Sequence, residues 1–143
     1  DNATLSSAES CTGGNIARLL TTIPGSSAYF IGSVVAYHNN VKQNMLDVSE
    51  NDLKTHGAVS EPVVLQMANG AKEKFGTDYA VATSGIAGLD GGTNDKPVGT
   101  IWIAVAGPKR TITRKFNFGN NRLRNIQKTS FMALNMLREE LMA

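Results

Sequence analysis

The sequence predicts an α/β fold, specifically a three-layer α/β/α sandwich on a mixed, mostly parallel sheet of about five strands. Three observations support this class: β-branched apolar segments alternate with amphipathic helical segments, small-residue turns follow two predicted strands, and a hairpin precedes the last helix. Strands separated by helices pair in parallel, whereas a hairpin adds antiparallel strands, so the sheet is mixed. A chain of 143 residues is long enough to bury such a core as a single domain over residues 1–143.

Apolar period, caps and breakers define each element in turn. Pro24-Gly25 breaks the first helix. Ser49 and Ser60 stand where a short helix and a longer helix are expected to begin. In chain order, the sequence predicts a strand over 4–8, a helix between Gly14 and Pro24, a strand over 29–37, two short helices, a longer helix after Ser60, a strand over 79–83, a hairpin of 98–105 with 111–116, and a helix over 122–141.

Two of these helices have a recognisable inner face. After Ser60, apolar residues recur at i, i+3, i+4, i+7 and i+11 from Val64 to Phe75, which places them on one side of a helix. The helix over 122–141 is expected to face the core with Ile126, Ser130, Leu134, Leu137 and Leu141. Both helices are therefore expected to cover the sheet.

Composition excludes several classes of protein. The 14 basic and 12 acidic residues are spread along the chain, so the net charge of +2 provides no electrostatic footprint for nucleic acid or a membrane surface. No apolar run approaches the roughly 20 residues that span a bilayer. The single cysteine, Cys11, cannot form an internal disulfide, which fits a reducing, cytoplasmic location. No cluster has metal-ligand spacing, so neither a metal nor a cofactor is expected.

Ser10 is a candidate nucleophile because it lies between a predicted strand and a predicted helix. In such a turn its hydroxyl can lie at the positive end of the helix dipole. The N–H groups of Thr12, Gly13 and Gly14 could then hold an oxyanion or a phosphate. From the residues alone, however, a helix N-cap is the more common role of a serine at this place.

A serine nucleophile needs a base. Neither His38 nor His56 lies in a recognisable catalytic signature, so a lysine whose burial keeps its amine neutral is the alternative. Lys42 follows the second strand, and a helical turn could bring it back toward the hydroxyl of Tyr37. From the residues alone, a solvated helix lysine and a half-buried strand tyrosine are the preferred interpretation of the two residues. Cys11 is a rival nucleophile, although a lone cysteine is more often a small buried hydrophobe.

The segment from Ser84 to Gly99 is predicted to be a loop at the carboxyl end of a strand, where ligands bind in α/β sheets. It matches neither the Walker pattern nor the dinucleotide fingerprint, so a plain connection remains an alternative. Arg122 opens the last helix and could pair with a phosphate, or simply be a surface arginine. Glu9 and Asp90 could form a carboxylate pair, although the sequence sets no distance between them. The candidate binding residues of the loop are Ser84, Gly85, Ala87, Gly88, Gly91 and Gly92.

Six segments follow one another in an order typical of one family. They are Ala8–Gly14, Pro24–Ser27, Tyr37–Lys42, His56–Ser60, Ser84–Gly92 and Lys96–Thr100. Together they resemble the CinA C-terminal domain family, which includes stand-alone nicotinamide mononucleotide deamidases, over nearly the whole chain. The resemblance implies an α/β/α fold with a mixed sheet. Many members are the second half of a longer protein, so the chain is expected to be a fragment or the second domain of such a protein.

The resemblance also implies an activity, the hydrolysis of the carboxamide of nicotinamide mononucleotide to nicotinate mononucleotide and ammonia. The catalytic serine, tyrosine and lysine of the family fall on Ser10, Tyr37 and Lys42. In the expected mechanism, neutral Lys42, assisted by Tyr37, takes the proton of Ser10. N–H groups around Thr12–Gly14, or donors in the 84–92 loop, hold the oxyanion.

The expected partner is a small-molecule nucleotide. Its ribose phosphate would lie against the glycine-rich loop, with Arg122 or Lys96 as charge partner. Phe30 and Ile31 could also support a homo-oligomer.

Departures from the family pattern motivate a second hypothesis. Almost nothing precedes Thr4, where the family usually has a helix, and the spacing from glycine to Arg122 is shifted by one. His38 stands in place of a small hydroxyl residue and Leu89 in place of proline. The alternative function is therefore a catalytically weak or inactive nucleotide-sensing or partner-binding domain.

Overall fold

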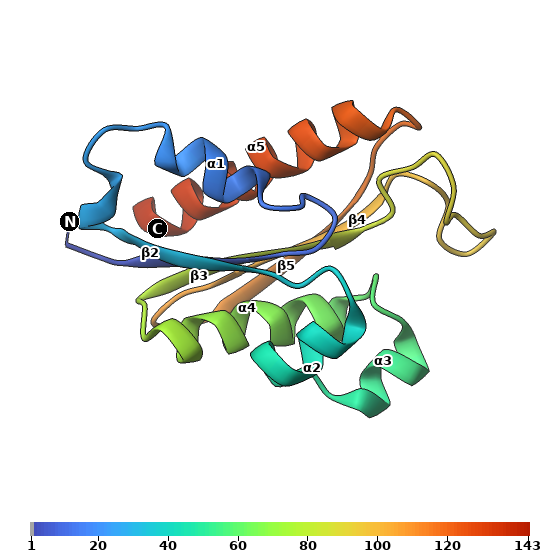
Figure 1. Cartoon of the computed structure of the whole chain (residues 1–143), viewed down its shortest axis with the longest axis horizontal. Coiled ribbons are helices and arrows are strands. Elements are labelled where there is room, and N and C mark those ends of the chain that lie inside the picture. Colours follow the sequence, from blue (N-terminus) through green and yellow to red (C-terminus); the bar gives the residue numbers. More distant parts are fainter. Residues whose placement is uncertain (1) are drawn as a thin grey trace.

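A computed structural model describes residues 2–143 as a five-stranded sheet with five α-helices (Figure 1). In chain order the elements are β1 (Leu5–Glu9), α1 (Asn15–Thr21), the short 3₁₀ turn η1 (Ser26–Ala28), β2 (Phe30–Val35), α2 (Asn39–Leu46), α3 (Glu50–His56), α4 (Glu61–Phe75), β3 (Tyr79–Gly85), β4 (Thr100–Ala106), β5 (Thr111–Asn117) and α5 (Arg122–Met142). The predicted order of strands and helices is confirmed, with boundaries displaced by a few residues.

The sheet has the strand order β2-β1-β3-β4-β5 and is mixed, as predicted. Strand β1 pairs in parallel with both β2 and β3, whereas β4 pairs antiparallel with both β3 and β5. Only β4 therefore runs against the other strands. Figure 1 shows α1 and α5 on one face of the sheet and α2, α3 and α4 on the other, which is the predicted three-layer sandwich.

Helix α4 buries the predicted apolar face. Val64, Met67 and Ala71 are fully buried against the sheet, and Phe75 packs at its end. The ring of Phe75 lies so close to Gly32 in β2 that an added Cβ would approach it to 2.9 Å. A side chain larger than hydrogen at this position would therefore force the Phe75 ring to shift.

The predicted inner face of α5 is only partly right. Ser130 and Leu137 are buried, whereas Leu141 is 43% exposed and Ile126 is half-buried. The face that contacts the sheet instead includes two polar side chains, Asn125 and Thr129. Their donor groups are paired inside the protein, which offsets part of the cost of burial, whereas the Asn125 Oδ1 has no partner among residues 2–143. For example, the Thr129 hydroxyl donates to the Asn125 carbonyl at 2.6 Å.

The predicted caps differ in outcome. Ser49 caps α3 as expected, because its Oγ accepts from the Asp52 N–H at 3.2 Å. Ser60 occupies the N-cap position of α4, but its hydroxyl donates to the Gly57 carbonyl at 2.8 Å instead of accepting from the helix. The position was thus predicted correctly and the hydrogen bond was not. Within residues 2–143, no helix combines the length and the apolar character needed to cross a membrane.

Candidate functional site

A cavity of about 320 Å³ opens at the carboxyl ends of the parallel strands. Its walls come from the turns after β1 and β2, from α2, from the connection before α4, from the end of β3 with the loop that follows it, and from the first residue of α5. The predicted site residues that line it are Ser10, Tyr37, Lys42, Ser84, Gly85, Ala87, Gly88, Gly91 and Arg122. Segments far apart in the sequence meet here because parallel strands end at the same edge of a sheet.

Ser10 and Lys42 are in direct contact within this cavity. The Nζ atom of Lys42 lies 3.2 Å from the Oγ atom of Ser10. The same Nζ donates to the Ala36 carbonyl at 2.8 Å and to the Tyr37 carbonyl at 3.3 Å. Lys42 is only 1% exposed, and this burial lowers its pKa below the ordinary value of 10.5. Its amine is thus biased toward the neutral form.

In its neutral form, the amine of Lys42 has one orientation that satisfies its neighbours. It carries two N–H groups and one lone pair. Two of its three polar neighbours, the carbonyls of Ala36 and Tyr37, can only accept hydrogen bonds, so they take the two N–H groups. The lone pair is left for the third neighbour, the hydroxyl of Ser10. This arrangement lets Lys42 accept the proton of Ser10.

Local structure explains how the two residues meet. Ser10 directly follows β1, where Glu9 pairs with Val35 of the adjacent parallel strand. Helix α2 then begins with His38 as its N-cap, whose Nδ1 accepts from the Asn40 N–H at 3.0 Å. The first turn of α2 brings Lys42 back under the end of β2. His38, which departs from the family pattern, therefore serves as a helix cap.

The structure corrects the expected role of the Tyr37 hydroxyl. Lys42 contacts the backbone carbonyl of Tyr37, whereas the Tyr37 hydroxyl lies 3.1 Å from Nη2 of Arg122. The Tyr37 residue is 62% exposed and lines the cavity, so it lies at the mouth. Arg122 also donates to the Gly88 carbonyl. Tyr37 and Arg122 thus form the outer wall, and Ser10 with Lys42 forms the inner one.

Cys11 lines the same cavity but is poorly suited to be a nucleophile. Burial raises the pKa of its thiol to about 12. The reactive thiolate is therefore scarce near neutral pH. The geometry favours the neighbouring hydroxyl of Ser10.

Sequence reasoning missed the role of Glu9. Its fully buried carboxylate accepts from the N–H groups of Ile16 and Ala17 at 2.9 Å each, and so caps the start of α1. The same carboxylate accepts from the Thr12 hydroxyl at 2.7 Å. Glu9 does not line the cavity that Asp90 lines, so the two carboxylates are not a pair in the site. An acidic residue ahead of a helix start was the available signal.

Thr12, Gly13 and Gly14 lie outside the cavity walls, contrary to their expected place beside the substrate. The Thr12 hydroxyl contacts Glu9, and the Gly13 N–H donates to the Ser10 carbonyl at 3.1 Å. Gly14 is the N-cap of α1, in the left-handed region at φ 100°. Ser10 is therefore not a helix cap either, because α1 begins five residues later, at Asn15.

Replacing Glu9 with glutamine is expected to lower the free energy of unfolding by about 2–4 kcal/mol. The amide keeps the shape of the carboxylate but turns one acceptor into a donor, which then faces a backbone N–H of Ile16 or Ala17. Urea denaturation measures the effect. The matched control is Glu73→Gln on the exposed side of α4. Equal stability of the two variants would contradict the capping role.

The glycine-rich loop forms one side of the cavity. The Ser84 hydroxyl donates to the Ala58 carbonyl at 2.7 Å, which ties the loop to the connection before α4. Gly88 has φ +111°, a conformation that favours glycine. Gly92 does not line the cavity, since it packs against Val98, whose backbone N would lie 2.7 Å from an added Cβ.

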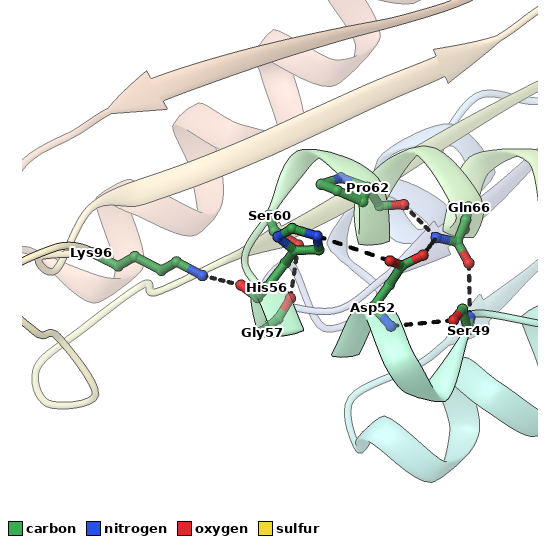
Figure 2. A network of polar contacts seen from close by, with 8 residues as sticks. All are labelled: Ser49, Asp52, His56, Gly57, Ser60, Pro62, Gln66 and Lys96. Carbon is green, nitrogen blue, oxygen red and sulfur yellow. Dashed lines mark hydrogen bonds and ion pairs between the residues drawn. The ribbon is translucent and has the colours of Figure 1, made fainter. Parts of the chain in front are cut away.

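Lys96 lies outside the cavity, which corrects its expected role as a charge partner for the substrate. Figure 2 shows its side chain directed to the backbone carbonyl of His56, at the end of α3. In the same network, Gln66 Nε2 donates to Asp52 Oδ2 at 2.7 Å, and Gln66 Oε1 accepts from the Ser49 N–H at 2.8 Å. Through its hydrogen bond to the His56 carbonyl, Lys96 links the glycine-rich loop to the end of α3. No three His, Cys, Asp or Glu side chains gather as metal ligands would in the part of the chain that the structure describes.

Fold and site together define a class: an α/β/α domain in which a serine hydroxyl meets a buried lysine amine at the carboxyl ends of parallel strands. The sequence model of the CinA C-terminal domain matches residues 1–141. The chain belongs to the CinA C-terminal domain family.

Known relatives agree with this assignment. The chain is 51% identical over 140 residues to a CinA-like protein of Cytophaga hutchinsonii. The aligned region covers 98% of this chain and 34% of that protein. A solved structure of competence/damage inducible protein CihA from Agrobacterium tumefaciens is 41% identical, with a TM-score of 0.95 over 96% of this chain and 85% of that one. The competence damage-inducible protein A from Klebsiella pneumoniae has a TM-score of 0.94 at 36% identity, over 98% and 87% of the two chains. The chain thus spans about a third of the length of the curated relatives it matches.

Proposed function

We propose that this domain hydrolyses the carboxamide of nicotinamide mononucleotide to nicotinate mononucleotide and ammonia. The observation that carries the proposal is the contact of 3.2 Å between Lys42 Nζ and Ser10 Oγ, with the remaining lysine hydrogens held by two carbonyls. This is a nucleophile and its base, and burial biases the base toward its active form. The resemblance to nicotinamide mononucleotide deamidases supports the choice of substrate.

The mechanism is acyl transfer. Ser10 Oγ attacks the carboxamide carbon while Lys42 Nζ takes the hydroxyl proton, and a tetrahedral intermediate forms. The C–N bond then breaks, and Lys42 returns the proton to the amide nitrogen, which leaves as ammonia. Water, deprotonated by the same amine, attacks the ester, and Ser10 regains its proton as nicotinate mononucleotide leaves. Tyr37 and Arg122 at the cavity mouth bind the ribose phosphate.

Incubation of the chain with nicotinamide mononucleotide, followed by measurement of released ammonia, tests this function. Nicotinamide riboside, which lacks the phosphate, is expected to react with a higher KM because it loses the Arg122 contact. Arg122→Gln should remove the difference between the two substrates. Absence of ammonia release from either compound would contradict the proposal.

The rate is expected to depend on pH through Lys42. Since burial lowers its pKa, kcat/KM should rise with pH along a limb with a single ionisation below 10.5. On the acid side of that ionisation, each pH unit is expected to change the rate about tenfold, because only the neutral amine accepts the proton. A pH-rate profile in buffers of constant ionic strength measures this. A flat profile from acid to alkaline pH would contradict a lysine base.

The second candidate is a nucleotide-sensing or partner-binding domain. The observation that favours it is the Tyr37 hydroxyl, which contacts Arg122 and not Lys42. Calorimetry separates the two functions. Tight binding of the nucleotide without ammonia release, unaffected by Ser10→Ala, would favour the binding domain.

A further inference from the structure

Two consecutive carbonyls of the cavity loop are held from the first turn of α5. Asn125 Nδ2 donates to the Ala87 carbonyl at 2.9 Å, and Arg122 donates to the carbonyl of Gly88. Asn125 is only 1% exposed, and the same Nδ2 also donates to the Gly119 carbonyl at 2.7 Å. Both of its amide hydrogens are therefore committed to backbone, and its orientation is set.

These contacts determine where the loop N–H groups point. In a trans peptide, the N–H points opposite to the carbonyl of the preceding residue. The Ala87 carbonyl points to Asn125, so the Gly88 N–H points away from α5. The Ile86 carbonyl accepts from the Gly99 N–H at 2.7 Å, so the Ala87 N–H points away from that strand end. Ala87 and Gly88 both line the cavity that contains Ser10.

Neither of these two N–H groups has an acceptor among residues 2–143. Such groups are normally paired when they are buried, and both residues are buried. Two other backbone donors near the nucleophile are already used. The Ser10 N–H donates to the Thr83 carbonyl at 3.1 Å, and the Gly13 N–H donates to the Ser10 carbonyl.

We propose that the N–H groups of Ala87 and Gly88 form the oxyanion hole for attack by Ser10, and that Asn125 is the residue that positions them. Two adjacent backbone N–H groups make a concave anion site. During attack, the carbonyl oxygen of the substrate gains negative charge and accepts from both groups. This inference rests on the proposed function, because it requires acyl transfer to Ser10.

The direct test removes one N–H by replacing the amide at Gly88 with an ester, through incorporation of glycolic acid. Loss of one oxyanion donor is expected to lower kcat about 10²-fold with little change in KM. The matched control is the same exchange at Ile86, whose N–H donates to the Thr100 carbonyl at 2.9 Å and takes no part in the site. Equal losses in the two esters would overturn the proposal.

A second variant tests the positioning role. Asn125→Leu has a similar volume and removes both amide donors without adding a charge, so it should lower kcat about 10–100-fold and leave the pH of the Lys42 ionisation unchanged. Its control is Asn121→Ala, which removes the N-cap contact of Asn121 Oδ1 with the Arg124 N–H at 3.0 Å. If both variants lost kcat alike, Asn125 would only stabilise α5 and the positioning role would be overturned.

The affinity for a boronic acid distinguishes a failure of this inference from a failure of the proposed function. Pyridine-3-boronic acid adds to the Ser10 hydroxyl, the proton passes to Lys42, and the resulting tetrahedral boronate places an oxygen where the oxyanion forms. We expect the Gly88 ester to bind it about 10²-fold more weakly than the unmodified chain. Undiminished affinity would overturn the oxyanion assignment and leave Ser10 as the nucleophile. Failure of the unmodified chain to form the adduct would overturn both.

The residue after a nucleophile is the other donor that hydrolases use, and here it is Cys11. The kcat of Cys11→Ala is compared with that of a chain carrying lactic acid at position 11, an ester that has the alanine side chain but lacks the backbone N–H. A loss of kcat with this ester and none with the Gly88 ester would assign the oxyanion hole to Cys11 and overturn the proposal. The opposite pattern supports Gly88.

Discussion

Replacing Ser10 with alanine is expected to lower ammonia release from nicotinamide mononucleotide by roughly 10⁴–10⁶-fold. The hydroxyl is the only protein group in the mechanism that forms a bond to substrate carbon, so no acyl-enzyme can form without it. Nucleotide binding should persist, because Tyr37 and Arg122 at the cavity mouth are untouched. Ammonia release measures the first effect and calorimetry the second.

The control for Ser10→Ala is Cys11→Ala, a change in the next residue and in the same cavity. Since the pKa of the Cys11 thiol is raised to about 12, this variant should retain most of the activity. Mass spectrometry of the chain quenched during turnover should find the nicotinoyl adduct on the peptide that contains Ser10. Turnover that survives Ser10→Ala, or an adduct on Cys11, would contradict the assignment.

Replacing Lys42 with methionine is expected to lower the rate by roughly 10⁴-fold at every accessible pH. Methionine fills similar space but cannot accept the Ser10 proton. The double variant with Ser10→Ala should be no less active than the worse single variant, because the two residues act as a unit. Single-turnover measurement of acylation isolates the affected step.

Two further measurements separate a base from a merely structural lysine. In Lys42→Ala, added ethylamine should restore part of the rate in proportion to its neutral fraction. Lys74→Met, on the exposed side of α4, should leave the rate unchanged. A shifted pH optimum with full activity in Lys42→Met would contradict the base role.

The lowered pKa of Lys42 also has a consequence for stability. Between that lowered value and the ordinary value of 10.5, the unfolded chain keeps the lysine proton that the folded chain has released. The free energy of unfolding should therefore rise with pH in this interval through Lys42. Urea denaturation at several pH values should find this contribution to the slope missing in Lys42→Met.

Much of the fold could be predicted from local patterns. The apolar repeat from Val64 to Phe75 predicted α4, and Pro24-Gly25 predicted the end of α1. The inner face of α5 was less predictable, because Asn125 and Thr129 are polar. Asn125 donates to the tertiary partners Ala87 and Gly119, and Thr129 donates to the Asn125 carbonyl one turn earlier in the same helix. The hydrophobic period detects apolar faces and does not detect buried polar side chains that donate hydrogen bonds inside the protein.

The candidate site divides in the same way. Residue types and places at strand ends made Ser10, Lys42 and the glycine-rich loop candidates, and the resemblance to the CinA C-terminal domain family gave Ser10 and Lys42 their expected catalytic roles. Sequence reasoning also placed Thr12 to Gly14 and Lys96 beside the substrate, where the structure does not put them. Proximity in the chain was a poor guide to proximity in the cavity.

By itself, the sequence determined the order of strands and helices, the mixed sheet and the identity of the candidate nucleophile. Only the tertiary structure decided that Lys42 contacts Ser10, that Glu9 caps α1 and that Asn125 holds the Ala87 carbonyl. The physical reason is that burial and hydrogen-bond partners arise from segments far apart in the chain. Lys42 is an ordinary lysine in the sequence and acquires its lowered pKa only when the surrounding elements exclude water from it.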